Sequence, residues 1–147
     1  MPTAAKLAAA MLFTALAVLA ALVYRPLLPE GTQTGWLMPC SAAIGLICGW
    51  RIMGRLTGKG YMPAMNTGIR VSVTTLFWVA LGFSIYTMIV RSTKMLYGAD
   101  PGEAILAVFD LMLGYGALML DGPFIAVVLL GGVICGALSE YVGQRWS

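Results

Sequence analysis

The stretch GWRIMGRLTGKGY, which runs from Gly49 to Tyr61, separates two long apolar segments of the chain. Three basic residues recur in it at four-residue steps: Arg51, Arg55 and Lys59. Short loops with an excess of Lys and Arg are typical of the inner side of a membrane protein. The stretch therefore predicts a tight, basic turn at the membrane surface, between two membrane helices.

A phosphate-binding loop is the main alternative for this stretch. A Walker loop needs a first glycine five residues before its Gly-Lys pair, and a Ser or Thr directly after that pair. Met53 and Gly60 occupy those two positions, so the spacing excludes a nucleotide loop. Three basic residues are also fewer than the roughly four to eight that indicate specific recognition of a lipid headgroup.

The composition indicates that lipid is the solvent of this chain. Of its 147 residues, 60% are hydrophobic and only 10% are charged, whereas soluble domains carry roughly 25% charged residues. The net charge of +3 is too small and too scattered for nucleic-acid binding. The chain has no His, and its three cysteines, Cys40, Cys48 and Cys135, form no CxxC pair. We therefore expect no metal site, no cofactor and no disulfide framework, and we expect the cysteines to be packing residues.

Five apolar stretches are long enough to cross a bilayer, which takes roughly 17–25 residues. They cover residues 4–24, 36–53, 67–95, 103–120 and 124–142. The first stretch lacks a small-residue cleavage site, so it is expected to be a membrane helix and not a signal peptide. The sequence therefore predicts an all-α integral membrane protein: one domain over residues 1–147, with about five transmembrane helices and short loops.

The last two stretches meet at Asp121-Gly122-Pro123. Together they cover 40 residues, which at ~1.5 Å per residue gives ~60 Å, more than a bilayer core. We expect the chain to fold back at this tripeptide, as a tight αα-hairpin or as a re-entrant pair. With the N-terminus inside, five spans place the C-terminus outside, and Glu140 then lies at the outer rim beside cations such as Arg25.

Small residues at four-residue steps form two seams that permit close approach between helices. One seam is Ser41, Gly45 and Gly49, and the other is Gly132 and Gly136. In lipid, close backbone contact is a main source of helix association. We expect both seams to lie at helix contacts, with each other as one possibility.

Asp110 lies about ten residues into the fourth stretch. A charged Asp at the bilayer centre costs roughly 2.5–3.5 kcal/mol on insertion scales. A partner is therefore expected: Arg91 in an intramembrane polar site, or a hydrogen bond to Tyr86 or Thr87. A contact with another subunit and a role in transport are the alternatives.

Two further carboxylates share the helical stripe of Asp110. Glu103 lies seven residues before it and Asp121 eleven after it, so at 100° per residue both return to within ~20° of its direction. Such a stripe can conduct protons or cations. The ordinary interpretation is that Glu103 belongs to a helix cap and Asp121 to a turn.

Four stretches together resemble a known family. They are the N-terminal MPTAAKL, LLPEGT at Leu27–Thr32, GWRIMGRLTGKGY, and LLGGVICGALSEYVGQRW at Leu129–Trp146. In these stretches the chain resembles the TrgA family, small alphaproteobacterial membrane proteins associated with tellurite resistance. The resemblance spans nearly the whole chain and implies a protein of the inner membrane that helps cells tolerate tellurite. It implies no mechanism and no functional residues.

Three functions follow from these observations. The first is the tellurite-associated role, in a multi-pass protein of the bacterial inner membrane with a cytoplasmic N-terminus. The second is a non-catalytic accessory or assembly subunit of a larger respiratory or photosynthetic complex. The third is a small ion or proton transporter that uses Asp110. An enzyme is not expected, because the sequence contains no HExxH, nucleophile–base pair or cofactor motif. Expected partners are membrane lipid and other membrane subunits, or further copies of the chain.

Overall fold

The computed structural model describes residues 3–28, 35–93 and 101–146, and all regular elements in these ranges are helical. The elements are α1 (Thr3–Tyr24), η1 (Arg25–Leu27), α2 (Leu37–Cys48), η2 (Gly49–Met53), α3 (Gly54–Leu56), α4 (Tyr61–Thr93), α5 (Pro101–Leu118) and α6 (Gly122–Arg145). Five helical stretches are long and apolar enough to cross a membrane. The prediction of an all-α membrane bundle is confirmed.

The second membrane helix is one rod made of α2, η2 and α3. A single π-helical turn, η2, joins the two α-helical parts, and the rod ends at Thr57, whose backbone is extended. Gly58 and Gly60 then adopt left-handed conformations, with φ of 95° and 107°, which side chains other than hydrogen disfavour. α4 begins directly after them, earlier than the predicted residue 67, because Pro63 is compatible with the first turn of a helix.

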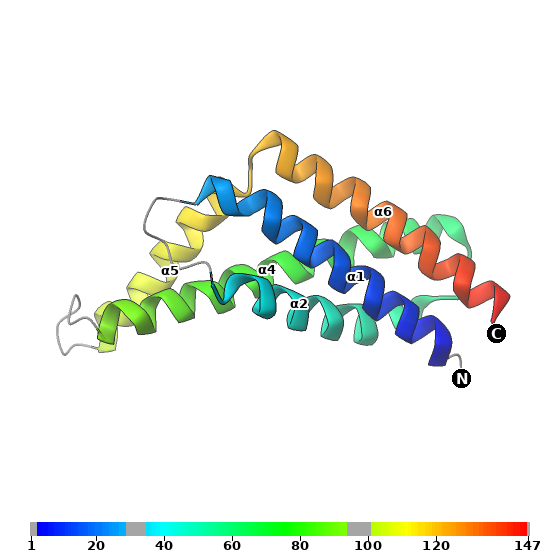
Figure 1. Cartoon of the computed structure of the whole chain (residues 1–147), viewed down its shortest axis with the longest axis horizontal. Helices are drawn as coiled ribbons and strands as arrows, with labels where there is room; N and C mark the ends of the chain where they lie inside the picture. Colours follow the sequence, from blue (N-terminus) through cyan, green and yellow to red (C-terminus); the bar gives the residue numbers. More distant parts are fainter. Residues whose placement is uncertain (1–2, 29–34, 94–100, 147) are drawn as a thin grey trace.

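α1, α2, α4 and α6 form a four-helix bundle (Figure 1). α1 packs against α2 and α6, and α4 packs against α6 and α2. One buried cluster, which includes Phe13, Met53 and Val71, fills the half of the bundle near the N-terminus. A second cluster, which includes Tyr24 and Phe124, fills the other half and continues onto α5.

Both ends of the chain lie at the same end of the bundle (Figure 1). The side chain of Lys6 covers Gly54, and a Cβ built on Gly143 would lie 3.7 Å from the Cβ of Ala5. The prediction that the C-terminus lies on the opposite side from the N-terminus is therefore wrong.

The cause of this error is the arrangement of α5 and α6. α6 packs along the first part of α4, where Gly132 meets Gly68, and α5 packs along the last part, where Tyr115 meets Phe83. α5 is steeply inclined to α1 and α6 (Figure 1), and the expected hairpin at residues 121–123 does not form. The length argument assumed that the second helix returns along the first, whereas α5 and α6 contact different parts of α4.

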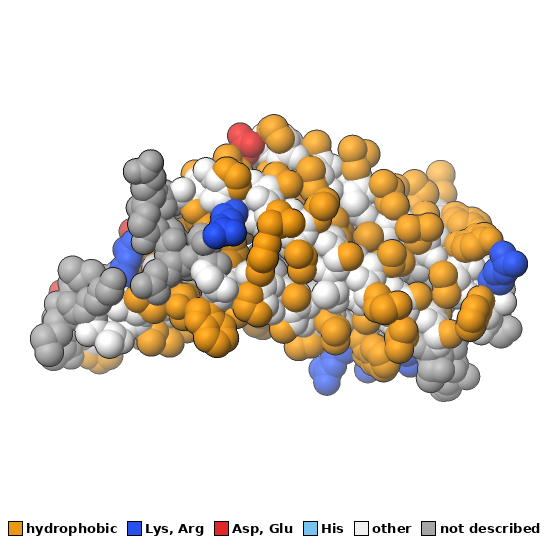
Figure 2. Space-filling model, viewed as in Figure 1, with side chains coloured by type: hydrophobic (Ala, Val, Ile, Leu, Met, Phe, Trp, Pro, Cys, Tyr) orange, Lys and Arg blue, Asp and Glu red, His pale blue; other side chains and the backbone are white. Residues whose placement is uncertain are grey.

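The surface of the bundle is mostly apolar, although Arg70 of α4 is exposed on it. Figure 2 shows hydrophobic side chains over most of the face in view, with few charged side chains among them. The exposed large residues come from all the long helices, for example Met11, Ile47, Trp78 and Leu130. Such a surface suits contact with lipid chains.

Candidate functional site

The basic turn is fastened to α6 by one buried carboxylate, Glu140, which is 0% exposed. The amide of Gly58 donates to Glu140 Oε2 at 2.7 Å, and the amide of Gly60 donates to Oε1 at 3.0 Å. Gln144 Nε2 donates a third hydrogen bond, also to Oε1, at 3.0 Å. Hydrogen bonds to an ionised acceptor are the stronger kind, so this contact clamps the turn onto the last helix.

The local sequence explains how two amides converge on one acid. The left-handed conformations of Gly58 and Gly60 turn both N–H groups toward the same side, and Lys59 between them points outward and is exposed. The sequence had placed Glu140 at the opposite rim beside Arg25, and this was wrong because α6 runs the other way. No local signal identifies the bond, since its partners lie about 80 residues apart.

The three basic residues of the turn are all exposed. Arg51 lies in the π-helical turn η2, Arg55 in α3, and Lys59 in the glycine turn. Their side chains are therefore accessible from outside the chain, and their contact with lipid headgroups stays a prediction. Glu140 already accepts hydrogen bonds from the amides of Gly58 and Gly60, so these two N–H groups are not free to bind a group outside the chain.

The seam of the second helix packs against α1. A Cβ built on Gly45 would lie 2.7 Å from the Cβ of Ala17, and one on Gly49 would lie 2.8 Å from the carbonyl oxygen of Ala9. Such distances are shorter than a real Cβ tolerates. Ser41, on the same seam, is buried, and its hydroxyl makes no hydrogen bond with the described residues.

The seam of α6 packs against α4. A Cβ on Gly132 would lie 3.1 Å from the carbonyl oxygen of Gly68, and one on Gly136 would collide with the carbonyl oxygen of Ala64. The two predicted seams thus lie at helix contacts, but they do not meet each other. The matching seam, Ala64, Gly68 and Ser72, follows the same four-residue step and was visible in the sequence but missed.

Asp110 and Arg91 do not form the expected pair. Both are exposed, and Asp110 makes no hydrogen bond or ion pair with the residues that the structure describes. Thr87, a suggested partner, donates instead to the carbonyl oxygen of Phe83 and lies 3.3 Å from the Tyr115 hydroxyl. Glu103 and Asp110 lie on one exposed side of α5, but α5 ends at Leu118 and Asp121 has an extended backbone before α6, so the predicted stripe of three carboxylates does not form.

Tyr115 is the residue that attaches α5 to the bundle, and the sequence did not single it out. Among the 18 residues of α5 it is the only buried one. Its ring packs on Phe83 at a centroid distance of 5.1 Å, and its carbonyl oxygen accepts a hydrogen bond of 3.0 Å from the Tyr24 hydroxyl. An aromatic residue with a polar tip suits such a junction.

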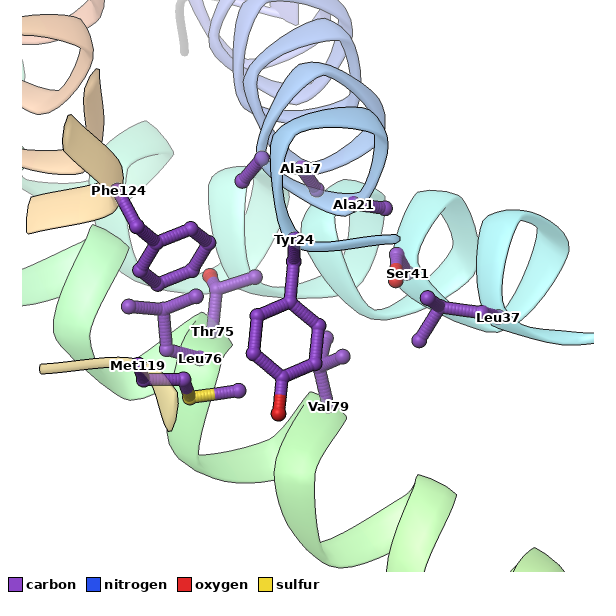
Figure 3. Close-up of a pocket in the computed structure, with 11 residues that line it drawn as sticks. Ala17, Ala21, Tyr24, Leu37, Ser41, Thr75, Leu76, Val79, Met119 and Phe124 are labelled. Carbon is purple, nitrogen blue, oxygen red and sulfur yellow. The ribbon is translucent and has the colours of Figure 1, made fainter. Parts of the chain in front are cut away.

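Two small cavities, of about 20 Å³ each, lie inside the bundle. Figure 3 shows the first, where Tyr24, Phe124, Leu76 and Val79 surround the space and Ser41 lies on its α2 side. Neither lining contains a charged residue. A cavity of this size holds about one water molecule, so it offers no room for a substrate.

The cysteines are dispersed through the bundle. All three are free; Cys48 and Cys135 are buried, and the Cys135 thiol donates to the carbonyl oxygen of Leu12 at 3.6 Å. In the described parts of the chain, no three His, Cys, Asp or Glu side chains gather where they could hold a metal ion.

Comparison with known proteins gives one partial likeness. No family model matches the chain, and no solved structure matches it. Over 94 residues the chain is 29% identical to a phospho-N-acetylmuramoyl-pentapeptide-transferase of Rippkaea orientalis (strain PCC 8801 / RF-1). This region is 64% of the chain but only 24% of that transferase, so the chain spans about a quarter of its relative. The likeness to an integral membrane enzyme and the five apolar helices fit a multi-pass membrane protein.

Proposed function

We propose that this chain is a non-catalytic membrane protein that acts by association with another membrane component, as an accessory or assembly subunit does. The observation that carries the proposal is Asp110. It is an exposed carboxylate in the middle of α5, and the described residues offer it no partner. An exposed carboxylate on an otherwise apolar helix gives electrostatic complementarity to a basic side chain of a partner protein. The group that would pair with the Asp110 carboxylate is a Lys or Arg side chain of another protein.

The surroundings of Asp110 support this proposal. Leu106 and Leu113, one turn to either side, are 70% and 74% exposed, so the chain itself does not cover this part of α5. Lipid chains cover leucine side chains well but offer nothing to a carboxylate. The acidic group is therefore the part of α5 that favours association.

A role in tellurite tolerance is the second candidate, and it rests on the resemblance to the TrgA family. Tellurite tolerance is a property of the whole cell, so it is compatible with a chain that acts by association with another membrane component. Deletion of the gene should increase sensitivity to tellurite, and the wild-type chain should restore growth. Unchanged growth of the deletion strain on tellurite would remove this candidate.

Transport and catalysis receive less support. A transporter needs a polar path through the bundle, whereas the two cavities have apolar linings and Asp110 lies on the outer surface of α5. A transferase reaction needs a cluster of reactive groups, and the partial likeness covers too little of that enzyme to supply one. We therefore propose that the chain is not an enzyme.

Purification from native membranes tests the association. Wild-type chain with a terminal tag should co-purify with a defined membrane complex at a constant ratio. The Asp110→Asn variant should reach normal abundance but lose most of that complex, because the amide retains size and removes charge. Glu103→Gln on the same side of α5 is the matched control. A wild-type chain that purifies alone contradicts the proposal, and a strong fall in the abundance of Asp110→Asn indicates a structural role.

A further inference from the structure

We propose that α5 does not cross the bilayer but lies on its surface, with an apolar ridge in the headgroup layer and an acidic edge toward water. The ridge consists of Ile105, Leu106, Phe109 and Leu113, and the acidic edge consists of Glu103 and Asp110. The ridge contacts lipid of the same membrane that the bundle spans. This inference concerns the position of α5 and does not depend on the proposed function.

The four-helix bundle alone has the thickness of a bilayer. The uncharged part of α1, between Lys6 and Arg25, has 18 residues, about 27 Å at ~1.5 Å per residue. The uncharged part of α6, between Asp121 and Glu140, also has 18 residues and the same length. Both values fit a hydrocarbon core of about 30 Å.

The charged residues that limit these two helices lie at matching levels. At one end Lys6 covers Gly54, which lies four residues before Gly58, the partner of Glu140. At the other end the rings of Tyr24 and Phe124 are 5.4 Å apart, and they are adjacent to Arg25 and close to Asp121 respectively. The uncharged parts of α1 and α6 thus begin and end at the same two levels, and these levels indicate the two membrane boundaries.

α4 is too long for this layer, and α5 packs on its excess. α4 starts at the level of Glu140, where the amide of Gly60 is bound, and a core of about 30 Å takes up about 20 of its 33 residues. The remainder extends beyond the boundary near Arg25 (Figure 1). Phe83 and Thr87, which hold Tyr115 of α5, belong to this remainder.

α5 exposes two kinds of side chain on two neighbouring sides. The ridge residues are between 59% and 74% exposed, and the steps of four and seven residues between them keep them on one side of the helix. Glu103 and Asp110 follow the adjacent side, seven residues apart. A helix with an apolar side and a charged side is the type that lies in the interface plane.

The residues around the ridge favour lipid as its contact. The hydrogen bond from the Tyr24 hydroxyl to Tyr115 ties the last turns of α5 to the boundary of the bundle, so the ridge cannot move far from the headgroups. Arg25 and Arg91, both exposed at this end, complement anionic headgroups. In this position Asp110 faces water, and its charge needs no partner within the bilayer.

Spin labels at single cysteines test this position. The background is a chain without Cys40, Cys48 and Cys135, reconstituted into phosphatidylethanolamine–phosphatidylglycerol vesicles. Labels at Leu113→Cys and Asp110→Cys are compared with two controls, Leu130→Cys in the middle of α6 and Lys59→Cys in the basic turn. Collision with oxygen and with a water-soluble nickel chelate gives the depth of each label.

The Leu113 label should lie at a shallow depth, about 5–10 Å below the headgroups, and the Asp110 label should be as accessible to nickel as the Lys59 control. An Asp110 label as deep as the Leu130 control would mean that α5 crosses the bilayer and would overturn the proposal. A Leu113 label as accessible to nickel as Lys59 would also overturn it, because solvent or a protein then covers the ridge. If the cysteine-free chain does not fold, a ketone amino acid at the same positions carries the label in the wild-type background.

Discussion

At the residue scale, Glu140 is the side chain with the clearest structural role. Its two oxygens accept from the amides of Gly58 and Gly60 and from Gln144. Glu140→Gln removes the charge and turns an amide N–H₂ group toward donors. Hydrogen bonds to charged groups contribute about 1.5–3 kcal/mol, and we expect a loss of that order in the free energy of unfolding in detergent. Gln144→Ala, which removes one of the three donors, should cost less; an unchanged unfolding midpoint for Glu140→Gln contradicts this account.

The glycines of the same turn make a separate prediction. Gly58 has φ of 95°, a conformation that a Cβ disfavours, and open space surrounds it, so only the backbone penalises a substitution. Gly58→Ala should therefore lower the free energy of unfolding by about 1–2 kcal/mol. Gly114→Ala is the matched control, because Gly114 is helical and also faces open space. Its helix propensity should make it neutral or slightly stabilising. Thermal unfolding of both variants in one detergent decides between strain at residue 58 and a general effect of alanine.

At the element scale, the contact between α4 and α6 depends on glycine. A Cβ on Gly132 would meet the Ser72 hydroxyl at 2.6 Å and the carbonyl oxygen of Gly68 at 3.1 Å. Gly132→Leu should force the helices apart and lower the unfolding temperature in detergent by several degrees, since overpacking costs about 1–3 kcal/mol. Gly114→Leu adds the same side chain to an open surface and should leave the unfolding temperature nearly unchanged. Equal effects of the two substitutions would show that the seam is not a packing contact.

The sequence predicts the helices better than it predicts which helices contact one another. Apolar runs of bilayer length identified all five long helices, because helices in contact with lipid need such runs. The seams were visible as four-residue steps, but the step does not say which helix a seam meets. Asp110 and Glu103 were correctly placed on one side of a helix, yet periodicity cannot say which way that side faces. The bond of Glu140 required the direction of α6, which the turn at Asp121 does not reveal.

At the scale of the whole molecule, the arrangement of charge favours one orientation. The end that holds both termini carries Lys6, Arg51, Arg55, Lys59 and Arg145, the described basic residues near the other end are Arg25 and Arg91, and Arg70 lies within α4. Lys and Arg near short loops gather on the cytoplasmic side. The position of Arg145 at the end of α6 adds to this difference. We therefore propose that this end faces the cytoplasm.

This orientation leads to a prediction that needs no substitution within the helices. If four segments cross the membrane and α5 does not, the number of crossings is even and both termini lie in the cytoplasm. Reporters that are active in only one compartment, fused in turn to the N- and C-terminus, should both report the cytoplasm. A fifth crossing by α5 reverses the C-terminal reporter alone, because the direction of α6 then changes relative to α1. The bond between Glu140 and the turn at Gly58 and Gly60 also requires both at one membrane face. A C-terminal reporter in the opposite compartment therefore contradicts both the even count and the clamp on the basic turn.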